Sequence, residues 1–421
     1  MLDSRNSSGC GCGEIAELSG PLTLEAAIES ALSQVSPSDE TEVVPLGEAC
    51  GRTAADDIHA TGAMPRFDNS AMDGFALRCA DLQGGHCLPI AGTIAAGDAP
   101  RALPKGTALR IFTGAPLPAR ADAVVMVERC AVSGSKVQFA TQPAPGDNIR
   151  RRGSDQAAGQ MLVPSGAQLA PHHIGLLAAN GINRIAAARK PRVAVFSTGD
   201  EISDGTCAPG QIPDANRPLL LALVRQAGAE ATDLGILPDE PKATADAFAA
   251  TSERYDLIVT SGAVSMGGKD HIRDALIAAG GDVNGWRVAL KPGKPVMFGR
   301  LGGTAFTGLP GNPFAVHVGF HLFVAPQIAR LLGARPARFA TVPACAGFNW
   351  ARKPGRAEVF PVRLATYDKN GLPVLERLGC SVSATLLPLS EADGLAVVPA
   401  GTDQVSTGDR LSWHPFCRTG E

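Results

Sequence analysis

The sequence predicts a multidomain protein of α/β and β parts, and three observations carry this prediction. From 189 to 333, short apolar runs alternate with segments of helical period, which is the pattern of a doubly wound α/β domain. On either side of this region, short β-like runs are separated by turns rich in Gly, Pro and Asp. The chain of 421 residues is also too long for one hydrophobic core.

Two predicted helices flank a β module in the first 188 residues. Thr23 can cap a helix that runs through LEAAIESALSQV, and QLAPHHIGLLAANGI predicts another helix, closed by Gly181. Between them lie the β-like runs CLPIAGTI, ALRIFTG, DAVVMVE and KVQFA. We therefore expect a disordered tail over 1–19 and a mostly-β module over 61–159.

Regular alternation follows in the α/β region. The runs that predict strands are RVAVFSTG, ATDLGILP, DLIVTSG, VMFGRL and TAFTGLP. The segments that predict helices are RPLLLALVRQAG, KATADAFAATSER, HIRDALIAAGG and PFAVHVGFHLFVAPQIARLLG. This alternation implies a parallel sheet with helices on both faces. After a linker at 333–338, short strand candidates predict a C-terminal β-barrel or sandwich.

The composition argues against several classes of protein. A net charge of -3 leaves no excess of Lys and Arg to neutralise phosphates, so we expect no nucleic-acid partner. The first residues contain acids and no long apolar run, so we expect neither a signal peptide nor a membrane span, and a cytoplasmic location. Ten cysteines are too few for a disulfide scaffold, and GCGCG lacks the CxxC spacing of metal sites.

Three glycine-rich turns fall where predicted strands end, at 196–201, 259–270 and 306–313. In an open α/β sheet, ligands bind beyond the carboxyl ends of the strands, and each turn can present backbone N–H groups to an anion. Any one of these turns alone would be an ordinary strand–helix connection. The three together predict a binding edge with the candidate residues Ser197, Thr198, Gly199, Ser261, Gly262, Ser265, Pro310, Gly311, Asn312 and Pro313.

The last of these turns also begins a helix. Asn312 is a suitable N-cap, and Pro313 fits the first helical position because its missing N–H costs nothing there. The remaining free amides are expected to face the site, with the positive end of the helix dipole behind them.

A basic segment, WRVALKPGKPVMFG, lies between two predicted strands and carries Arg287, Lys291 and Lys294. Such cations are most often solvated, but beside three amide-rich turns they suggest a pocket for a polyanion. The same edge carries the acids Glu201, Asp239 and Asp270. Because acids repel an anion unless a cation lies between them, the pattern predicts a phosphate group together with Mg²⁺.

The β module contributes three polar turns, at 65–77, 112–128 and 146–159. Asp73-Gly74 can form a tight turn that exposes the carboxylate. The run Arg150-Arg151-Arg152 is either a solvated charge cluster or a clamp that binds phosphate through paired N–H groups.

Other motifs are weaker. His317 and His321 have an i, i+4 spacing that zinc can use, but no third ligand follows, so packing or surface placement is the preferred interpretation. The sequence has no recognisable Ser–His–acid grouping, no GxGxxG after a strand and no GKS or GKT phosphate loop.

Together the motifs resemble those of the molybdopterin molybdenumtransferases, a bacterial family similar to the E domain of gephyrin and its plant counterparts. The likeness covers about residues 20–415 and rests on FDNSAMDGFA, IFTGAPLP, ADAVVM, DNIRRRGSD, VAVFSTGDE, GQIPDANR, LGILPDEP, SGAVSMGGKD, LKPGKPVMFG and GLPGNP. It implies four domains: a helical domain in two pieces (20–60 and 160–188), the β module (61–159), an α/β domain like the molybdopterin adenylyltransferases (189–333), and a C-terminal β-barrel (337–417).

The resemblance implies an activity as well: insertion of molybdenum from molybdate into adenylylated molybdopterin, with Mg²⁺ and with release of AMP. It implies a homodimer whose active site lies between the α/β domain of one subunit and the β module of the other, and a molybdopterin adenylyltransferase as the upstream partner. The catalytic groups that it indicates are Asp73, Asp155, Glu201, Asp239 and Asp270, the last three as Mg²⁺ ligands. The substrate contacts that it indicates are Thr113, Arg150, Arg287, Lys291, Lys294 and the turn residues named above.

The sequence departs from the family pattern at Ala263, Met266 and Arg287, where the family has Gly, Val and Lys. These departures concern substrate geometry, and the choice between molybdate and tungstate stays open. Two other functions also stay open: a molybdopterin-binding scaffold without chemistry, and adenylyl transfer from ATP. The retained acids argue against the scaffold, and the extra β module and barrel favour insertion.

Overall fold

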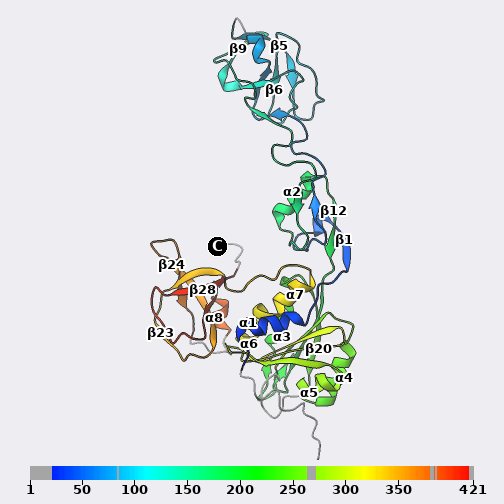
Figure 1. Cartoon of the computed structure of the whole chain (residues 1–421), viewed down its shortest axis with the longest axis vertical. Helices are drawn as coiled ribbons and strands as arrows, with labels where there is room; N and C mark the ends of the chain where they lie inside the picture. The colour runs from blue at the N-terminus through cyan, green and yellow to red at the C-terminus, as the bar shows by residue number, and fades with distance from the viewer. Residues whose placement is uncertain (1–20, 83–84, 263–271, 380–383, 385, 417–421) are drawn as a thin grey trace, which may run out of the picture. The chain divides into compact units, whose positions relative to one another are not determined.

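The computed structural model describes residues 21–82, 85–262, 272–379, 384 and 386–416 (Figure 1). The chain forms two compact units. The first contains the chain up to Glu42, then Gly51–Ala55, and then everything from Ala187 onward; the second contains Val43–Cys50 and Asp56–Ala186. This division is coarser than the four domains expected from the sequence, whose boundaries stay a prediction.

A six-stranded sheet forms the centre of the first unit, in the order β16-β13-β17-β21-β20-β18. Its strands are β13 (Arg192–Thr198), β16 (Glu230–Leu237), β17 (Leu257–Ser261), β18 (Asp282–Arg287), β20 (Pro295–Leu301) and β21 (Thr304–Leu309). The first four strands of that order are parallel, whereas β20 pairs antiparallel with both of its neighbours, β21 and β18. The sheet is therefore mixed rather than wholly parallel, because the two-residue link between β20 and β21 is too short for a crossover.

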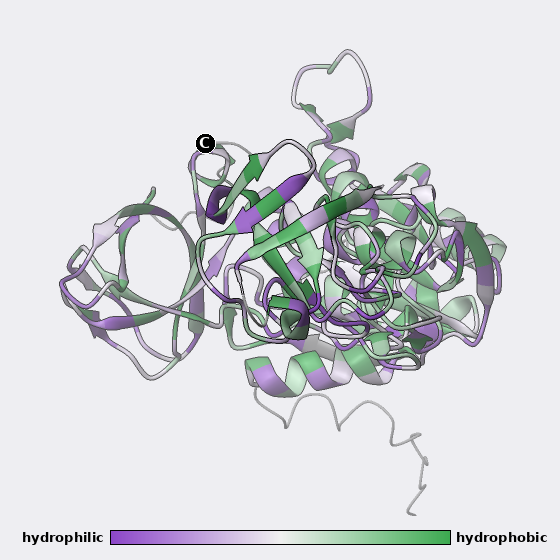
Figure 2. Ribbon diagram, turned by 90° about the horizontal axis from the view of Figure 1, so that it is seen from above, coloured by the Kyte–Doolittle hydropathy of each residue, from purple (hydrophilic) through white to green (hydrophobic). Residues whose placement is uncertain are grey.

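Helices cover both faces of this sheet, as the sequence predicts. They are α1 (Leu24–Ser33), α3 (Asn216–Gln226), α4 (Pro241–Thr251), α5 (Ile272–Ala278), α6 (Pro313–Gly319) and α7 (Ala325–Leu331). Alternate residues of β13 enter two cores: Val193 and Val195 pack with α1, α3, α6 and α7, whereas Ala194 and Phe196 pack with α4 and α5. Several ribbons change from hydrophobic to hydrophilic colour within one helix (Figure 2), as amphipathic helices do.

The last helix of this domain is continuous from Pro313 to Leu331 but contains a π-helical turn, η4 (Phe320–Val324). The turn lies just before Pro326, which has no backbone N–H to donate to the helical ladder. This helix has the length and apolarity of a membrane span, with a mean hydropathy of 1.2 over an 18-residue window. However, 78% of that window is buried. It is a core helix of the α/β domain.

The C-terminal strands close into a barrel. They are β22 (Val342–Ala346), β24 (Ala357–Tyr367), β25 (Pro373–Arg377), β26 (Gly394–Val398) and β28 (Arg410–Pro415). Because β24 pairs with both β25 and β26, the circuit through β22 and β28 has no open edge. This settles the choice between barrel and sandwich, and Phe360, Val362 and Leu375 fill the interior. A short strand from the α/β domain, β19 (Leu290–Lys291), adds to β24 in parallel.

The second unit contains a six-stranded sheet in the order β7-β4-β6-β5-β9-β8. Its strands are β4 (Gly74–Leu77), β5 (Cys87–Ile94), β6 (Ala108–Ile111), β7 (Ala123–Met126), β8 (Cys130–Ser133) and β9 (Lys136–Phe139). Four of them match the β-like runs of the sequence. The unit also contains α2 (Pro171–Ala179), after which Gly181 takes φ +74°. The paired strands β12 (Arg184–Ala188) and β1 (Thr41–Pro45) lie partly in this unit and partly in the first.

Candidate functional site

Three strands of the central sheet end level with one another. Ser197 of β13 pairs with Ser261 of β17, and Ser261 pairs with Leu309 of β21. The turns that follow therefore begin side by side, as the sequence predicts. We call residues 197–199, 261–262 and 310–313 the strand-end cluster.

The turns of the strand-end cluster touch one another through backbone atoms. Gly262 N donates to Leu309 O at 3.1 Å. A Cβ built on Gly311 would lie 3.6 Å from the Gly262 Cα, and one built on Gly262 would lie 2.4 Å from Thr198 O. Gly262 also has φ +96°, in the region that favours glycine. The cluster is therefore packed so closely that no side chain fits at its centre.

Ser197 and Ser261 were predicted to bind substrate, but their side chains are buried. The two hydroxyl oxygens lie 3.4 Å apart, and Thr198 Oγ1 donates to Ser261 O at 3.2 Å. These contacts join β13 to β17 directly under the turns. The hydroxyl groups of Ser197, Thr198 and Ser261 therefore stabilise the strand ends from which the turns begin.

The third turn begins the last helix of the domain as predicted. Asn312 takes the N-cap position with extended backbone (φ -78°, ψ 126°), and Pro313 takes the first helical position. Pro310 is buried, whereas Gly311 and Asn312 are exposed. The first turn of the helix thus opens at the exposed side of the cluster, where its dipole favours an anion.

Asn216 joins this cluster although the sequence did not single it out. Its Nδ2 donates to Gly311 O at 2.7 Å, across 95 positions of the chain. Asp214 holds the segment by accepting bonds from Asn216 N and from both the backbone N–H and the side chain of Arg217. Arg217, which is 6% exposed, also pairs with Asp204 and Asp233. In the sequence, Asp214, Asn216 and Arg217 are part of the GQIPDANR motif, which was the one feature that could have pointed to Asn216.

We expect an Asn216→Ala variant to lose roughly fivefold in kcat/KM, which corresponds to the ~1 kcal/mol of one hydrogen bond. The change frees the Gly311 carbonyl, so the turn is no longer held against α3. Steady-state kinetics measure the loss, with Asn370→Ala in an exposed barrel turn as the control. Unchanged kinetics for Asn216→Ala would show that the turn keeps its place without this bond.

The basic segment lies beside the third turn. A Cβ built on Gly293 would lie 4.0 Å from the Pro310 ring, so this segment contacts the strand-end cluster. Lys294 is exposed and Arg287 half-buried. Lys291 forms an ion pair of 2.8 Å with Glu358 of the barrel, which is 2% exposed and also pairs with Arg352. Of the three predicted cations, Lys291 is thus already engaged by a carboxylate.

Carboxylates lie at the end of β13, as predicted. The Glu201 carboxylate folds over Gly199, where a Cβ would lie 2.5 Å from Oε2. Asp239 N donates to Asp200 Oδ1 at 3.3 Å, which brings the segment after β16 to the same loop. Asp270, Ser265, Ala263 and Met266 lie outside the described residues. Within the described residues, no group of three or more His, Cys, Asp or Glu side chains has the arrangement of a metal site.

The predicted residues of the β module all lie in the second unit, and two of them, Asp73 and Thr113, are in contact. The Asp73 carboxylate accepts bonds from Thr113 N at 2.7 Å and Thr113 Oγ1 at 2.8 Å. These two bonds, the backbone one foremost, hold the pKa of Asp73 below its usual value. Arg150 pairs with Asn69 across a short two-stranded ladder, and Asp155 N donates to Met64 O at 3.0 Å. We call Asp73, Thr113, Arg150 and Asp155 the module cluster.

The arginines of the run at 150–152 differ in their contacts. Arg151 Nη1 lies 2.7 Å from Asp68 Oδ2, and Arg152 N donates to Asp68 Oδ1 at 2.8 Å. Both contacts lower the pKa of Asp68. Arg151 therefore braces the turn, while the side chain of Arg150 is exposed.

We expect Thr113→Val to raise the pKa of Asp73 toward its ordinary value, because the variant loses the hydroxyl donor and keeps the backbone donor. The carboxylate then protonates at a higher pH, so the acid limb of the activity profile should move upward. A carbon-detected NMR titration of Asp73 measures the shift, and Thr113→Ser should behave as the wild type. An unshifted pKa in Thr113→Val would mean that the hydroxyl does not act on Asp73.

The two histidines of the core helix pack as predicted. His317 is 8% exposed, its ring centroid lies 4.6 Å from that of His321, and His321 lies 5.3 Å from His414 of the barrel. Burial lowers the pKa of His317 to about 4 and that of His321 to about 3. Both rings are therefore neutral at pH 7 and join the helix to the barrel.

Comparison with known proteins covers nearly the whole chain. Three family profiles match: "MoeA N-terminal region (domain I and II)" at 22–181, "Probable molybdopterin binding domain" at 194–330, and "MoeA C-terminal region (domain IV)" at 343–416. The molybdopterin molybdenumtransferase of Haemophilus influenzae is 36% identical over 403 residues, covering 94% of this chain and 98% of that protein. That of Nostoc sp. is 35% identical over 381 residues, covering 88% and 87%.

Solved structures agree with this result. The molybdopterin biosynthesis MoeA protein from Pyrococcus horikoshii is 30% identical, with a TM-score of 0.77 over 94% of this chain and 98% of that chain. The likeness spans both units and the barrel, so the multidomain fold expected from the sequence is confirmed.

Proposed function

The chain belongs to the MoeA family of molybdopterin molybdenumtransferases, and we propose that it inserts molybdenum from molybdate into adenylylated molybdopterin and releases AMP. The observation that carries this proposal is the strand-end cluster, in which three glycine turns from 197–199, 261–262 and 310–313 touch one another. The start of a helix, with Lys294 and Arg287 on the adjoining segment, suits a phosphate or a tetrahedral oxyanion.

The reaction does not require a covalent bond between the protein and the substrate. Water or a molybdate oxygen attacks the phosphoanhydride bond of the adenylylated substrate and displaces AMP. The dithiolene sulfurs of the pterin replace oxygen ligands of the molybdate, which leave as water with the thiol protons. The protein therefore has to hold two anionic groups close together and balance their charge. Glycine amides, a helix start and exposed cations supply such groups without a protein nucleophile.

Glu201 and Asp239 are the residues that we propose as Mg²⁺ ligands in the described part of the chain, with Asp270 as a third outside it. Carboxylate oxygens are the donors that Mg²⁺ prefers, so this set fits the ion. When bound, Mg²⁺ would neutralise charge on the pyrophosphate link of the substrate. Chelation of divalent metal should then abolish AMP release and Mg²⁺ should restore it; activity that persists after chelation would refute this part of the proposal.

We propose that the protein works as a homodimer in which the module cluster of one subunit completes the strand-end cluster of the other. The pKa of Asp73 is lowered and its side chain is exposed, so a charged carboxylate is available on the module surface. Arg150 is exposed on the same unit and adds a cation. Neither cluster alone contains all the residue types that the reaction requires.

Mixing two inactive variants tests the shared site. Asp73→Asn alters the module cluster, and Gly262→Ala alters the strand-end cluster. If the site is shared, each mixed dimer has one site free of both changes, so random exchange should return about a quarter of wild-type activity. If mixed dimers form, as native mass spectrometry can show, and no activity returns, the site lies within one subunit.

The whole proposal is tested by incubating the purified protein with adenylylated molybdopterin, Mg²⁺ and molybdate, tungstate or no oxyanion. We expect AMP release together with retention of the metal, and the comparison of oxyanions gives the preference. ATP-dependent adenylylation of molybdopterin by this protein would favour the preceding step instead. Binding of molybdopterin without AMP release would favour a scaffold.

We expect the protein to act in the cytoplasm and to receive its substrate from a molybdopterin adenylyltransferase.

A further inference from the structure

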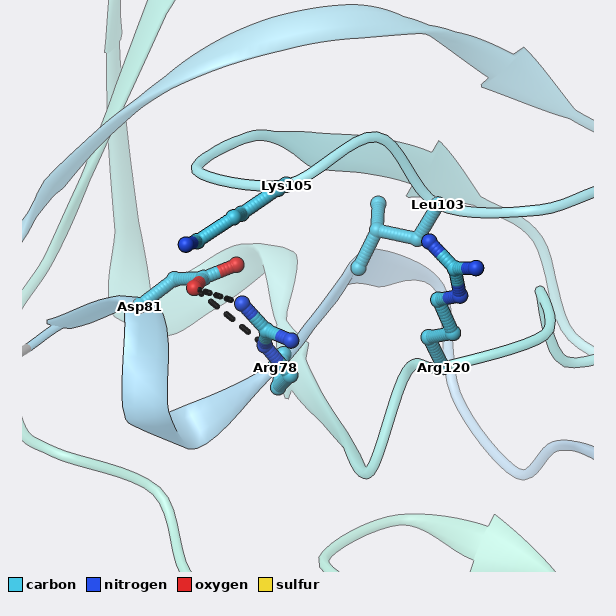
Figure 3. Close-up of a pocket in the computed structure, with 5 residues that line it drawn as sticks. All are labelled: Arg78, Asp81, Leu103, Lys105 and Arg120. Atoms are coloured by element: carbon cyan, nitrogen blue, oxygen red, sulfur yellow. Dashed lines mark hydrogen bonds and ion pairs between the residues drawn. The ribbon is translucent and has the colours of Figure 1, made fainter.

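A small basic pocket lies in the β module, away from the module cluster. It is lined by Arg78, Asp81, Leu103, Lys105 and Arg120 and has a volume of about 60 Å³ (Figure 3). Arg78 follows β4, whereas Asp73 precedes it, so the strand separates the two places by about 16 Å at 3.3 Å per residue. The pocket is therefore a separate feature of this unit.

Three chain segments are bonded together to form the walls of the pocket. Leu103 N donates to Ala119 O at 3.0 Å, which fixes the segment of Lys105 beside that of Arg120. Gly106 N donates to Asp81 Oδ2 at 2.9 Å, which fixes the same segment to the short helix η2 (Cys79–Leu82). Leu103, at 3% exposed, is the buried apolar part of the lining.

The pocket carries an excess of positive charge. Asp81 pairs with Arg78, and this hydrogen bond lowers the pKa of Asp81, so the two side chains neutralise one another. Asp122 lies near Arg78 as well and accepts a bond from Cys79 N at 2.7 Å. Among the described residues, no carboxylate lies within ion-pair distance of Lys105 or Arg120. In Figure 3, Lys105 extends toward Asp81, while Arg120 lies beside Leu103 on the far side of Arg78.

The backbone at Arg120 gives a second, independent observation. Ala121 N donates to Pro118 O at 3.0 Å, which closes a turn whose third residue is Arg120. Arg120 has φ +78°, in the left-handed region. Such a position favours glycine or asparagine, and a bulky side chain there is strained. Strain of this kind concentrates at functional sites. This strained position is the second observation from which we argue a role for the Arg120 side chain.

We propose that this pocket binds one phosphate-sized oxyanion, either inorganic phosphate or the phosphoryl group of a small metabolite. Arg120 supplies N–H donors on one side of the pocket, and Lys105, whose amino group reaches toward Asp81, supplies a point charge on the other. The Arg78–Asp81 pair forms the wall between them. The volume admits more than one water, since one water needs on the order of 10–15 Å³, but it does not admit a pterin nucleotide. The site is independent of molybdenum transfer, and its failure would leave that proposal untouched.

Titration of the full-length protein with inorganic phosphate, at constant ionic strength with chloride as the replaced anion, tests the site. The double variant Lys105→Gln/Arg120→Gln should lose at least tenfold in phosphate affinity at one site per chain. Arg129→Gln/Lys136→Gln removes two exposed cations of the same module and should bind as the wild type. Equal phosphate binding by the two double variants would overturn the proposal, because binding at the strand-end cluster is common to both.

A second variant separates binding from folding. Arg120→Gly should raise the Tm of the phosphate-free protein, because glycine relieves the left-handed backbone. It should also reduce the rise in Tm that phosphate produces in the wild type, leaving only the part due to the strand-end cluster. A lower Tm in Arg120→Gly, or an unchanged response to phosphate, would contradict the proposal. Repeating the titration with glycerol phosphate assigns the source: tighter binding indicates a metabolite, and weaker binding indicates free phosphate.

Discussion

A Gly262→Ala variant is expected to lose AMP-releasing activity by about a hundredfold or more, since a displacement of ~1 Å at a positioned site has an effect of that size. The new Cβ would lie 2.4 Å from Thr198 O and 2.7 Å from Thr198 Oγ1. The φ of +96° adds backbone strain. Either the first turn or the second must move, and the contact with Gly311 is lost with it. The assay measures AMP released from adenylylated molybdopterin.

Gly205→Ala is the matched control for this variant. Gly205 lies in the same domain, and a Cβ built there meets no atom within 4 Å. It should keep wild-type activity, and both variants should show the same far-UV circular dichroism. If Gly262→Ala folds and turns over at the wild-type rate, the strand-end cluster is not the place of reaction.

Stability is expected to fall by about 4 kcal/mol between pH 7 and pH 5 through His317 and His321, with a slope that approaches ~1.4 kcal/mol per pH unit for each ring below pH 6.5. Burial foremost, together with neighbouring histidines, lowers the pKa of His317 to about 4 and that of His321 to about 3. The unfolded chain therefore takes up protons first as the pH falls below 6.5. Stability is fully present above that pH and declines toward the folded pKa values. Urea unfolding at pH 7 and pH 5 measures the difference.

His317→Leu/His321→Leu should remove most of this pH dependence, because leucine does not titrate. His59→Leu replaces an exposed histidine and should leave the dependence as it is. If the double variant keeps the full decline between pH 7 and pH 5, other groups cause it and the histidine cluster is not the source.

The elements that the sequence predicted correctly are those set by local pattern. Apolar runs such as RVAVFSTG and DLIVTSG became buried strands, and Thr23 caps α1 by accepting a bond from Ala26 N at 3.2 Å. The glycine turns were predictable because parallel strands end at one edge. Their convergence followed from a rule of topology that needs no side-chain detail.

Other features depend on contacts between distant parts of the chain. The bond from Asn216 to Gly311 spans 95 positions, and the GQIPDANR motif that contains Asn216 does not indicate which residue it contacts. The pairing of β19 with β24, which places Lys291 against Glu358, joins the α/β domain to the barrel in the same way. The left-handed turn at Arg120 breaks the local preference for glycine, so a rule based on turn composition overlooks it.

The most direct test of the central claim is where the oxyanion binds. Crystals grown with tungstate and molybdopterin can be measured at the tungsten absorption edge, where one peak marks the metal. The account predicts this peak within hydrogen-bond distance of the backbone amides at 199 or 311, next to Lys294. Tungsten bound elsewhere, with these three turns free of ligand, would contradict it.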